Sequence, residues 1–428
     1  MRIIKRIKAR IKQKTSKNNT VPAGTPAETQ TGAELQPEQY AETYQGLINR
    51  LAGTLLRRYV PDSEPKKNLV FSPYSILTLL YMAADATAGT TRDEILSAAA
   101  GNLSLDEVRR MQAALTEAIS GSKELLSSNA VCVQEKLKDT INPAYPETLR
   151  KYFSGELFSS SDMITDVNAW VREKTNDMID GILDETMEGI LLCLANAVAF
   201  QADWERQYDE EDIYDERFVN ADGTSVSLPM LHSTEEAYVE DDAFTGFVKP
   251  YRDGRFSFMA LLPKDESYDG LVQASASVDF SALYQTWQSS DVHVFMPEFT
   301  CDFKDNLTDF CKGLGIREAF SGAADFSPLS SAWLKADALL HKAHIEVDRK
   351  GTKAAAVSAM VITKGCFMPG DFREYKTVEL NRPYIYAIIH NETAIPVFVG
   401  MTKHIDGTAF STEEKPADGQ DLGYFVLD

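Results

Sequence analysis

Apolar residues in the first half of the chain recur mostly at helical spacing. Between residues 40 and 59 they stand three or four positions apart, which predicts a first helix carrying Tyr44, Leu47, Ile48, Leu51 and Leu55. Similar patterns predict further helices over residues 73–84, 91–100, 104–119, 143–152 and 164–182. Short strands are expected at 68–71 and near the end of 123–134. Residues 191–200 form a nearly continuous apolar run, which is typical of a strand buried on both faces.

Beyond residue 200 the pattern favours strands. Alternating or continuous apolar residues predict them at 226–232, 237–240, 245–251, 255–262, 291–297, 343–349, 377–380, 384–390 and 395–401. Only residues 271–287 and 305–313 have helical character there. Helices in the first half and strands in the second predict an α+β fold. Because no repeat and no second linker interrupts residues 40–405, we expect one large domain.

Charge is unevenly distributed along the chain. There are 64 acidic and 43 basic residues, a net charge of −21, but residues 1–18 contain eight basic residues and no acidic one, which leaves −29 on the remainder. Isoleucines at helical spacing among these cations leave two interpretations open: a solvated terminus, or a basic amphipathic helix in weak contact with a membrane surface. A Thr/Ala/Pro/Gly-rich tract follows. We therefore expect an arm and linker (1–38), a folded domain (39–405) and a tail (406–428).

Composition narrows the function classes. The acidic balance argues against a nucleic-acid-binding body, because neutralising phosphates needs an excess of Lys and Arg. No apolar run approaches the ~18 residues of a membrane span, so we expect no transmembrane segment. The N-terminus lacks the apolar core and cleavage site of an ordinary signal peptide. The location of the protein, in the cytoplasm or outside the cell, therefore stays open.

Residues that often carry chemistry form no familiar motif here. The nucleotide-binding, esterase and zinc-protease signatures are absent, so we expect no cofactor and no enzyme, with an unrelated hydrolase as a minor alternative. The cysteines lack zinc-finger spacing and are expected to be mostly buried thiols, namely Cys132, Cys193, Cys301, Cys311 and Cys366. Whether Cys301 and Cys311 pair stays open. His341 and His344 would point to opposite faces of a strand, so we expect no metal there.

Several blocks, in a consistent order, resemble the serpins, a family of serine and cysteine protease inhibitors. They include NLVFSPYSI (68–76), GTTRDEIL (89–96), VNAWVREKT (167–175), LANAVAFQADWE (194–205), MPEF (296–299) and HKAHIEVDRKGTKAAA (341–356). Others are at 320–326, 381–384 and 396–400, so the resemblance covers residues 40–405. It implies the serpin fold, in which the helices of the first half pack on large mixed β-sheets and an exposed reactive loop lies near the C-terminus.

The resemblance also implies a mechanism and a partner. A target serine or cysteine protease cleaves the loop and forms an acyl-enzyme. The loop then inserts into the central sheet as a new strand and carries the covalently bound protease to the opposite pole. The protein would be a monomeric suicide inhibitor rather than a catalyst. The alternative within the family is a non-inhibitory serpin that acts as a binding or carrier protein.

The residues after the predicted strand at 343–349 fit such a loop. Residues 351–363 are rich in small side chains and uncharged apart from Lys353, and period-two alternation places Thr352 on the face opposite Lys353. Small inward side chains would let a strand enter a sheet without repacking its interior. A buried strand or a short helix remains the alternative interpretation. The expected hinge and insertion residues are Arg349, Gly351, Thr352, Ala354, Ala355, Ala356 and Ser358.

Counting 17 residues from Arg349, as in typical inhibitory members, places the reactive bond between Gly365 and Cys366. Counting back from Pro383 reaches 372–373 instead, and we favour the forward count because the sheet sets the length of insertion. Among the flanking candidates Lys364 would suit a trypsin-like or subtilisin-like protease. Phe367 and Met368 would suit a chymotrypsin-like one.

The resemblance also assigns residues that open the sheet. It maps this region onto Ser72, Pro73, Ser75, Asn196 and His341, and it places Trp204 beneath the hinge. A satisfied polar cluster and ordinary core packing are the alternative interpretations. The chain departs from the family at the first hinge position, where Arg349 replaces the usual Glu. We expect this charge reversal to remove a salt bridge at the top of the sheet.

Overall fold

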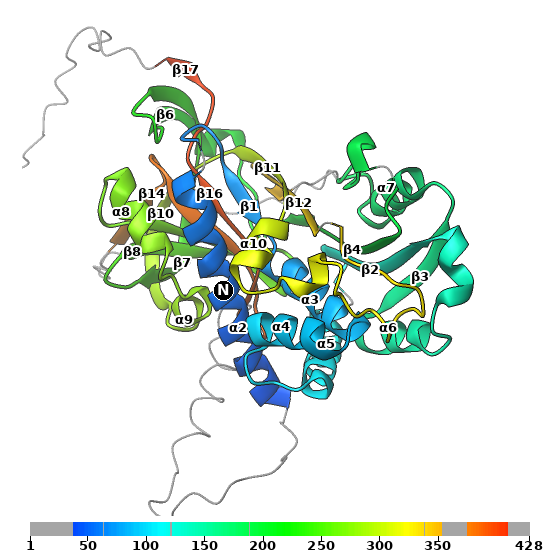
Figure 1. Cartoon of the computed structure of the whole chain (residues 1–428). Coiled ribbons are helices and arrows are strands. Elements are labelled where there is room, and N and C mark those ends of the chain that lie inside the picture. The colour runs from blue at the N-terminus through cyan, green and yellow to red at the C-terminus, as the bar shows by residue number, and fades with distance from the viewer. Residues whose placement is uncertain are drawn as a thin grey trace, which may run out of the picture.

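The computed structural model describes residues 37–62, 64–119, 122–187, 189–337, 339–352 and 375–409 (Figure 1). The predicted helices of the first half are confirmed, and their bounds are α2 Pro37–Asp62, α3 Pro73–Ala86, α4 Gly89–Ala99, α5 Leu105–Ile119, α6 Tyr145–Phe153 and α7 Met163–Lys174. The last of these ends eight residues before the predicted 182. Asn176 and Asp177 have φ of 50° and 59°, and consecutive left-handed residues do not continue a right-handed helix.

Most strands of the second half join one ten-stranded sheet of order β1-β16-β15-β9-β8-β7-β10-β14, with β6 and β17 also on β7. Their bounds are β1 Leu69–Phe71, β6 Ile213–Val219, β7 Ser225–Glu240, β8 Phe244–Pro250, β9 Phe256–Pro263, β10 Gln288–Pro297, β14 Tyr375–Glu379, β15 Tyr384–His390, β16 Ile395–Thr402 and β17 Thr408–Ala409. Two predicted strands are the single strand β7. The predicted helix at 271–287 is two short ones, α8 Tyr268–Ser275 and α9 Phe280–Gln285.

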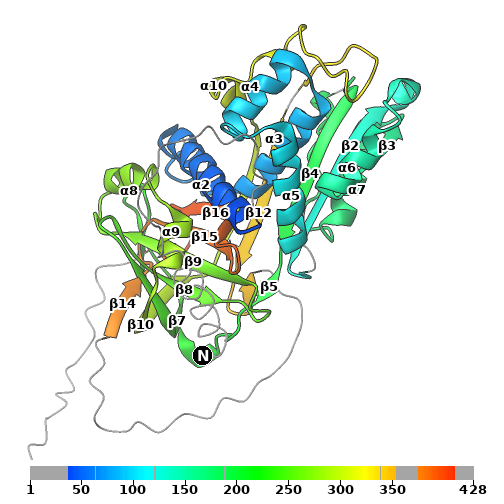
Figure 2. The same ribbon diagram turned by 90° about the horizontal axis from the view of Figure 1, so that it is seen from below.

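The remaining strands form two smaller sheets that lie next to each other. One has the order β3-β2-β4 and the other β11-β12-β13-β5. Their bounds are β2 Leu125–Gln134, β3 Gly155–Ser160, β4 Leu192–Phe200, β5 Ala202–Asp203, β11 Phe299–Asn306, β12 Leu340–Val347 and β13 Gly351–Thr352. β4 and β12 are neighbours in space (Figure 2), yet no ladder joins them among the described residues. The pattern did not predict β3, β6 or β11, and the helical character assigned to 305–313 belongs only to α10, Thr308–Gly313.

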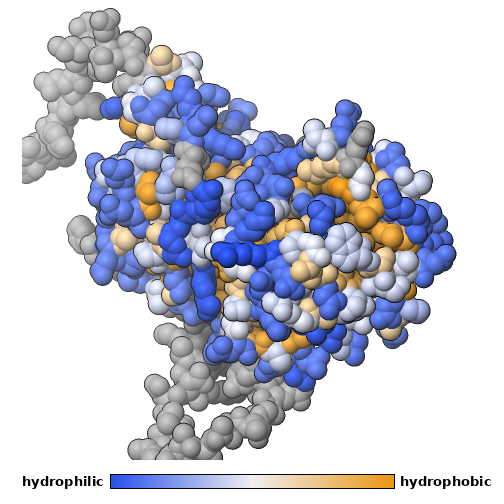
Figure 3. Space-filling model, viewed as in Figure 1, coloured by the Kyte–Doolittle hydropathy of each residue, from blue (hydrophilic) through white to orange (hydrophobic). Residues whose placement is uncertain are grey.

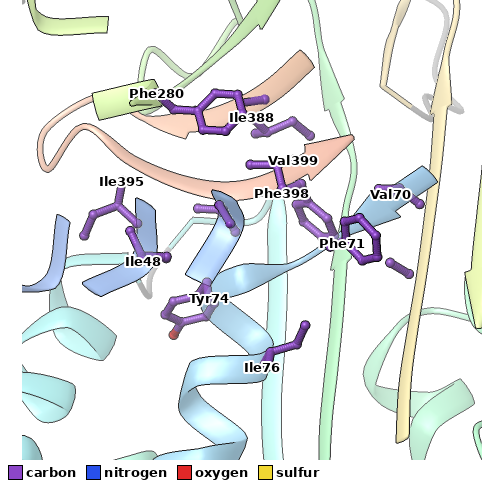
Figure 4. Packing of buried hydrophobic residues seen from close by; sticks show 14 of the residues in the cluster. Ile48, Val70, Phe71, Tyr74, Ile76, Phe280, Ile388, Ile395, Phe398 and Val399 are labelled. Atoms are coloured by element: carbon purple, nitrogen blue, oxygen red, sulfur yellow. The ribbon is translucent and has the colours of Figure 1, made fainter. Parts of the chain in front are cut away.

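The main core lies where α2, α3 and β1 meet the large sheet. Figure 4 shows Ile48 of α2, Phe71 of β1 and Tyr74 of α3 beside Phe398 and Val399 of β16, and none of these side chains is more than 2% exposed. Burying an aromatic or branched side chain of this kind stabilises the folded protein by roughly 1.5–3 kcal/mol. The apolar residues whose spacing predicted α2 therefore form the face by which this helix joins the core.

A second apolar cluster lies between α7 and the small sheets and packs them together. Val167, Trp170 and Val171 of α7 pack on Cys132 of β2 and Cys193 of β4, whereas α3, α5 and α6 cover the opposite face of these strands (Figure 1). Partly buried apolar residues border this cluster, namely Phe158, Ile164, Met187, Ile190 and Leu340. Figure 3 shows apolar surface on the same side of the molecule. The layer beneath α7 is thus smaller and less completely covered than the main core.

Several expectations about composition can be compared with the fold. Cys301 and Cys311 are both free and buried, so they do not pair, and burial raises the pKa of each thiol to about 12. Across the described ranges no helix is long and apolar enough to cross a membrane, and no cluster of three metal-ligating side chains occurs. Residues 1–36 of the predicted arm (1–38), residues 410–428 of the predicted tail (406–428) and Cys366 lie outside the described residues.

Candidate functional site

The hinge begins as a strand between two others. Gly351 and Thr352, which form β13, pair antiparallel with Asp203 and Ala202 of β5, and Thr352 also pairs with Val347 of β12. The intervening turn is closed by the Asp348 carboxylate, which accepts hydrogen bonds from the N–H groups of residues 350 and 351 at 2.7 and 2.9 Å. Residues 351–352 therefore already occupy a strand position at one end of the sheet.

The two hinge residues fit this position for different reasons. A Cβ atom on Gly351 would lie 2.0 Å from the carbonyl oxygen of Ala202, so only glycine allows the backbones to approach this closely. The side chain of Thr352 is fully buried, and its hydroxyl shares a 2.7 Å hydrogen bond with the hydroxyl of Tyr251. Burial raises the pKa of Tyr251, so this hydroxyl remains protonated. Thr352 thus faces the interior and is satisfied there.

Trp204 anchors the turn that leads into β13. Its indole N–H donates to the carbonyl oxygen of Asp348 at 2.8 Å, and its backbone N–H donates to that of Lys350 at 2.9 Å. The indole stacks on Tyr251 with ring centroids 4.6 Å apart and an interplanar angle of 9°. Trp204 is fully buried, and it therefore both packs the core and positions the hinge.

The hinge arginine has an acidic partner that the pattern analysis missed. The backbone N–H and Nε of Arg349 donate to Glu298 Oε1 at 2.9 and 3.2 Å. The backbone oxygen of Arg349 accepts from the N–H of Tyr208 at 3.0 Å. The expected loss of a salt bridge is therefore wrong, because Glu298, just before β11, supplies the opposite charge. Glu298 belongs to the MPEF block at 296–299, so the sequence had already singled out this segment.

A buried ion pair supports the aromatic residues under the hinge. Lys249 Nζ lies 2.6 Å from Glu235 Oε1, and both side chains are largely buried. The same ammonium lies 4.4 Å from the ring centroid of Tyr208 and 5.5 Å from that of Trp204. Burial by itself would lower the pKa of Lys249, but the negative charge of Glu235 beside it raises this pKa overall. Lys249 is therefore a charged support beneath both rings.

A line of polar side chains runs across the middle of the small sheets. Ser72 caps α3: its hydroxyl accepts from the N–H of Ser75 at 3.1 Å and donates to the backbone oxygen of Val397 at 2.8 Å. Its own N–H donates to His341 Nε2 at 3.1 Å. Pro73 occupies the first helical turn, where a missing N–H costs nothing. Burial lowers the pKa of His341 to about 4, so the imidazole is neutral and accepts this bond.

The same helix start also reaches the other small sheet. The hydroxyl of Ser75 donates to the side-chain oxygen of Asn196 on β4, and the amide of Asn196 donates to Asn129 Oδ1 on β2 at 2.6 Å. Because β12 and β4 share no ladder, the first turn of α3 links His341 on one sheet to Asn196 on the other. His344 lies on the opposite face of β12, where it contacts Asp302 at 2.8 Å. The two histidines therefore do not converge.

The predicted site residues divide into three groups. Arg349, Gly351, Thr352 and Trp204 meet at the hinge, and the second group meets at the start of α3, namely Ser72, Pro73, Ser75, Asn196 and His341. The third group lies outside the described residues and consists of Ala354, Ala355, Ala356, Ser358, Lys364, Gly365, Cys366, Phe367 and Met368. Residues that the pattern did not single out complete the site, namely Tyr208, Glu235, Lys249, Tyr251 and Glu298.

Comparison with known proteins agrees with this architecture. The model of one family, described as "Serpin (serine protease inhibitor)", matches residues 47–405. Iripin-2 of Ixodes ricinus is 28% identical over 381 residues, covering 83% of this chain and 92% of that protein. The native state of tengpin, a thermophilic serpin, superposes with a TM-score of 0.75 at 27% identity, covering 90% of this chain and 98% of tengpin. Human thyroxine-binding globulin, at 24% identity, a TM-score of 0.74 and coverage of 85% and 99%, shares the fold. The chain therefore belongs to the serpin family.

Proposed function

We propose that this protein irreversibly inhibits serine or cysteine endopeptidases by loop insertion. The protease nucleophile attacks the carbonyl carbon of a bond in residues 364–373, the new N-terminus leaves, and an acyl-enzyme ester or thioester remains. The residues from 353 onward then extend β13 through the sheet and draw the attached protease to the far end. The reactive bond would be Gly365–Cys366, with Lys364, Phe367 and Met368 as flanking determinants.

One observation carries the proposal: β13 lies in register between β12 and β5. A strand that begins there and continues in the same direction would run between β12 and β4, the two neighbours that share no ladder in the described chain. Each added residue would find unpaired backbone groups on both sides, so insertion would gain hydrogen bonds at every step. At ~3.3 Å per residue, the 17 residues 349–365 would span roughly 56 Å.

The burial of Thr352 supports the expected register of insertion. Since side chains alternate across a strand, residues 354, 356 and 358 would share the inward face of Thr352. Those positions are Ala, Ala and Ser, which need little space, and Lys353 would point outward. Ser72 and Ser75 would remain hydrogen-bonded to their helix and to β16 while the neighbouring strands part. The polar line would therefore let the sheet open without leaving buried polar groups unpaired.

A panel of proteases tests the proposal. The purified protein is incubated with trypsin, subtilisin, elastase and chymotrypsin, and the products are resolved on denaturing gels and identified by mass. We expect an SDS-stable complex with at least one of them and a higher unfolding temperature for the cleaved inhibitor. Cleavage without a complex and without gain in thermal stability would instead support the carrier alternative and contradict the inhibitory one.

An inward charge at the hinge provides a sharper test. Thr352→Arg places a cation where Thr352 is already fully buried against Tyr251, at a cost of roughly 3 kcal/mol or more, so β13 would be displaced from between β12 and β5 and could no longer lead the insertion. We expect cleavage as an ordinary substrate, measured as a rise in the stoichiometry of inhibition. Thr352→Val is the matched control, since it removes the hydroxyl but keeps the shape. Unchanged trapping by the arginine variant would show that the assumed register is wrong.

A further inference from the structure

A cavity of about 720 Å³ is lined by residues of α8, of three strands of the large sheet (β6, β9 and β14) and of the connection from β14 to β15. Figure 1 shows α8, β6 and β14 on the same side of the molecule. Three buried apolar side chains line its floor, namely Leu262, Pro263 and Leu271. A cavity of this size can hold a small organic molecule. None of the residues assigned to the hinge or to the start of α3 lines it.

Arg382, in the connection from β14 to β15, has an unused hydrogen-bond donor at this cavity. Its Nη2 donates to the backbone oxygen of Pro263 at 2.7 Å, which holds the guanidinium beside the apolar floor. Its Nε is buried and has no hydrogen-bond partner in the described chain. Burial lowers the pKa of Arg382, although the exposed rim residues Glu266 and Glu379 act in the opposite direction. The guanidinium is therefore a fixed cation that its acidic neighbours compensate only in part.

Tyr268, the first residue of α8, has a second unused donor at the same cavity. Its hydroxyl oxygen is buried and has no hydrogen-bond partner in the part of the chain that the structure describes. Burial raises the pKa of Tyr268, so the hydroxyl keeps its proton and can donate. Buried polar groups in folded proteins are usually paired. Two unpaired donors at one cavity therefore indicate an acceptor that the chain itself does not supply.

We infer that this cavity binds a small amphipathic carboxylate. The carboxylate would accept hydrogen bonds from Arg382 Nε and from the hydroxyl of Tyr268, and the apolar body of the ligand would lie on the leucines and the proline of the floor. A carboxylate fits because it only accepts hydrogen bonds and carries the charge opposite to that of the guanidinium. A phosphate fits less well, because its additional negative charge would face the two acidic side chains at the rim.

Such a ligand would join parts of the fold that are distant in the sequence. Arg382 follows β14, Tyr268 begins α8, and the floor belongs to β9 and α8. Because the site is complete only when these segments are in place, the ligand would bind the folded chain and stabilise it. This inference does not rest on the inhibitory function, since it concerns binding at a separate site.

The first test compares an acid with its amide. Naphthylacetate and naphthylacetamide are each titrated into the full-length protein in a calorimeter. We expect one acid molecule to bind per chain, and the amide, which keeps the apolar body but lacks the charge, to bind about tenfold more weakly. Arg382→Gln should weaken binding of the acid about tenfold and leave that of the amide unchanged. Arg150→Gln is the matched control, because Arg150 is an exposed arginine of α6 that does not line the cavity.

Tyr268→Phe provides a second variant that keeps the ring and removes only the unpaired hydroxyl. We expect it to weaken binding of naphthylacetate about fivefold, for the loss of one hydrogen bond to a charged group. The urea midpoint of unfolding without ligand should stay the same or rise, because the hydroxyl has no partner in the described chain. A hydroxyl with a purely structural role would lower that midpoint and leave binding unchanged. This variant also tests the site if Arg382→Gln does not fold.

Three results would overturn the inference. The first is no saturable binding of naphthylacetate to the parent protein. The second is equal affinity for the acid and the amide, which would show that the cation has no part in binding. The third is unchanged binding of the acid by the folded variants among Arg382→Gln and Tyr268→Phe, which would place the ligand elsewhere. The inhibitory function would survive all three, because the SDS-stable complex measures it separately.

Discussion

The hinge and the start of α3 hold the two small sheets by different kinds of contact. At the hinge, β13 is paired on both sides through its backbone, and Trp204 is stacked on Tyr251 beneath it. At the start of α3, side-chain hydrogen bonds alone run to His341 on β12 and Asn196 on β4. A backbone ladder fixes register residue by residue, whereas side-chain bonds fix only position. In the proposed mechanism the first region would direct the inserting strand, and the second would let the neighbouring strands part.

The difference also explains which residues each region requires. Close pairing at the hinge needs Gly351, because any side chain there would collide with the carbonyl of Ala202. The start of α3 needs short side chains with hydroxyl or amide groups, which can satisfy one another's hydrogen bonds inside the protein. The contribution of the hinge to stability should therefore depend mostly on ring packing. The contribution of the start of α3 should depend mostly on the protonation state of its histidine.

Removing the indole should have the largest effect. We expect Trp204→Ala to lower the free energy of unfolding by about 4 kcal/mol, since it deletes a fully buried stacked ring. Trp204→Phe is the matched control. It keeps an aromatic ring against Tyr251 but loses the hydrogen bond to Asp348, and should cost about 1 kcal/mol for that bond plus some packing. Urea unfolding measures both, and equal losses would show that stacking is not the dominant contact.

Acidification should act on the start of α3. The pKa of His341 is about 4 in the folded protein and about 6.5 when unfolded, so the unfolded chain binds the extra proton between these values. The contribution of His341 to stability is then full above pH 6.5 and falls as the pH drops towards 4, by about 3 kcal/mol for this one group. Protonation also removes the acceptor for the N–H of Ser72. Urea unfolding at a series of pH values measures this slope.

A non-titrating variant isolates the contribution of His341. Burial lowers the pKa of His390 to about 4 as well, so the parent should lose stability from two histidines over the same range. His341→Gln keeps a side-chain acceptor without a titrating ring and should remove roughly half of the slope. If the variant and the parent have equal slopes, His341 is not the group that responds.

The ion pair at the top of the hinge should have the smallest effect. The side chains of Arg349 and Glu298 are 40% and 32% exposed, so solvent screens their attraction and Arg349→Glu should cost less than about 1 kcal/mol. The double change Arg349→Glu with Glu298→Arg restores opposite charges and should recover most of that loss. A double-mutant cycle on the free energy of unfolding measures the coupling. A swap no more stable than Arg349→Glu alone would show that the orientation of the pair matters.

Periodicity predicted much of this architecture, and its failures have identifiable causes. It found α2, α3 and β4 because each presents a regular apolar face or a fully apolar run. It extended α7 to residue 182 because apolar spacing continues past Asn176 and Asp177, whose left-handed backbone ends the helix. It missed β11 because the alternation of apolar and polar residues there covers only residues 299–303 and three polar residues follow. The apolar residues of that alternation face the core, as Cys301 and Phe303 do.

The sequence blocks named the residues of the hinge and of the start of α3, but only part of their surroundings. The motif around residues 68–76 and the one around 341–356 placed Ser72, His341 and Thr352 in the site. Neither motif identified Tyr251 as the partner of both Trp204 and Thr352. Nor did the charge at Arg349 point to Glu298, because a charge by itself predicts no partner.

Local pattern decided which segments are helices and strands, which residues are small enough to enter a sheet, and where the chain is basic or acidic. These properties depend on neighbours in the chain. The tertiary structure decided that Ser72 meets His341, 269 positions away, and that Arg349 meets Glu298, 51 positions away. It also decided that β13 lies between β12 and β5 while β4 and β12 stay unpaired in the described chain. Such contacts depend on how the sheets pack, because packing decides which residues that are distant in the sequence meet in space, and no local periodicity encodes this.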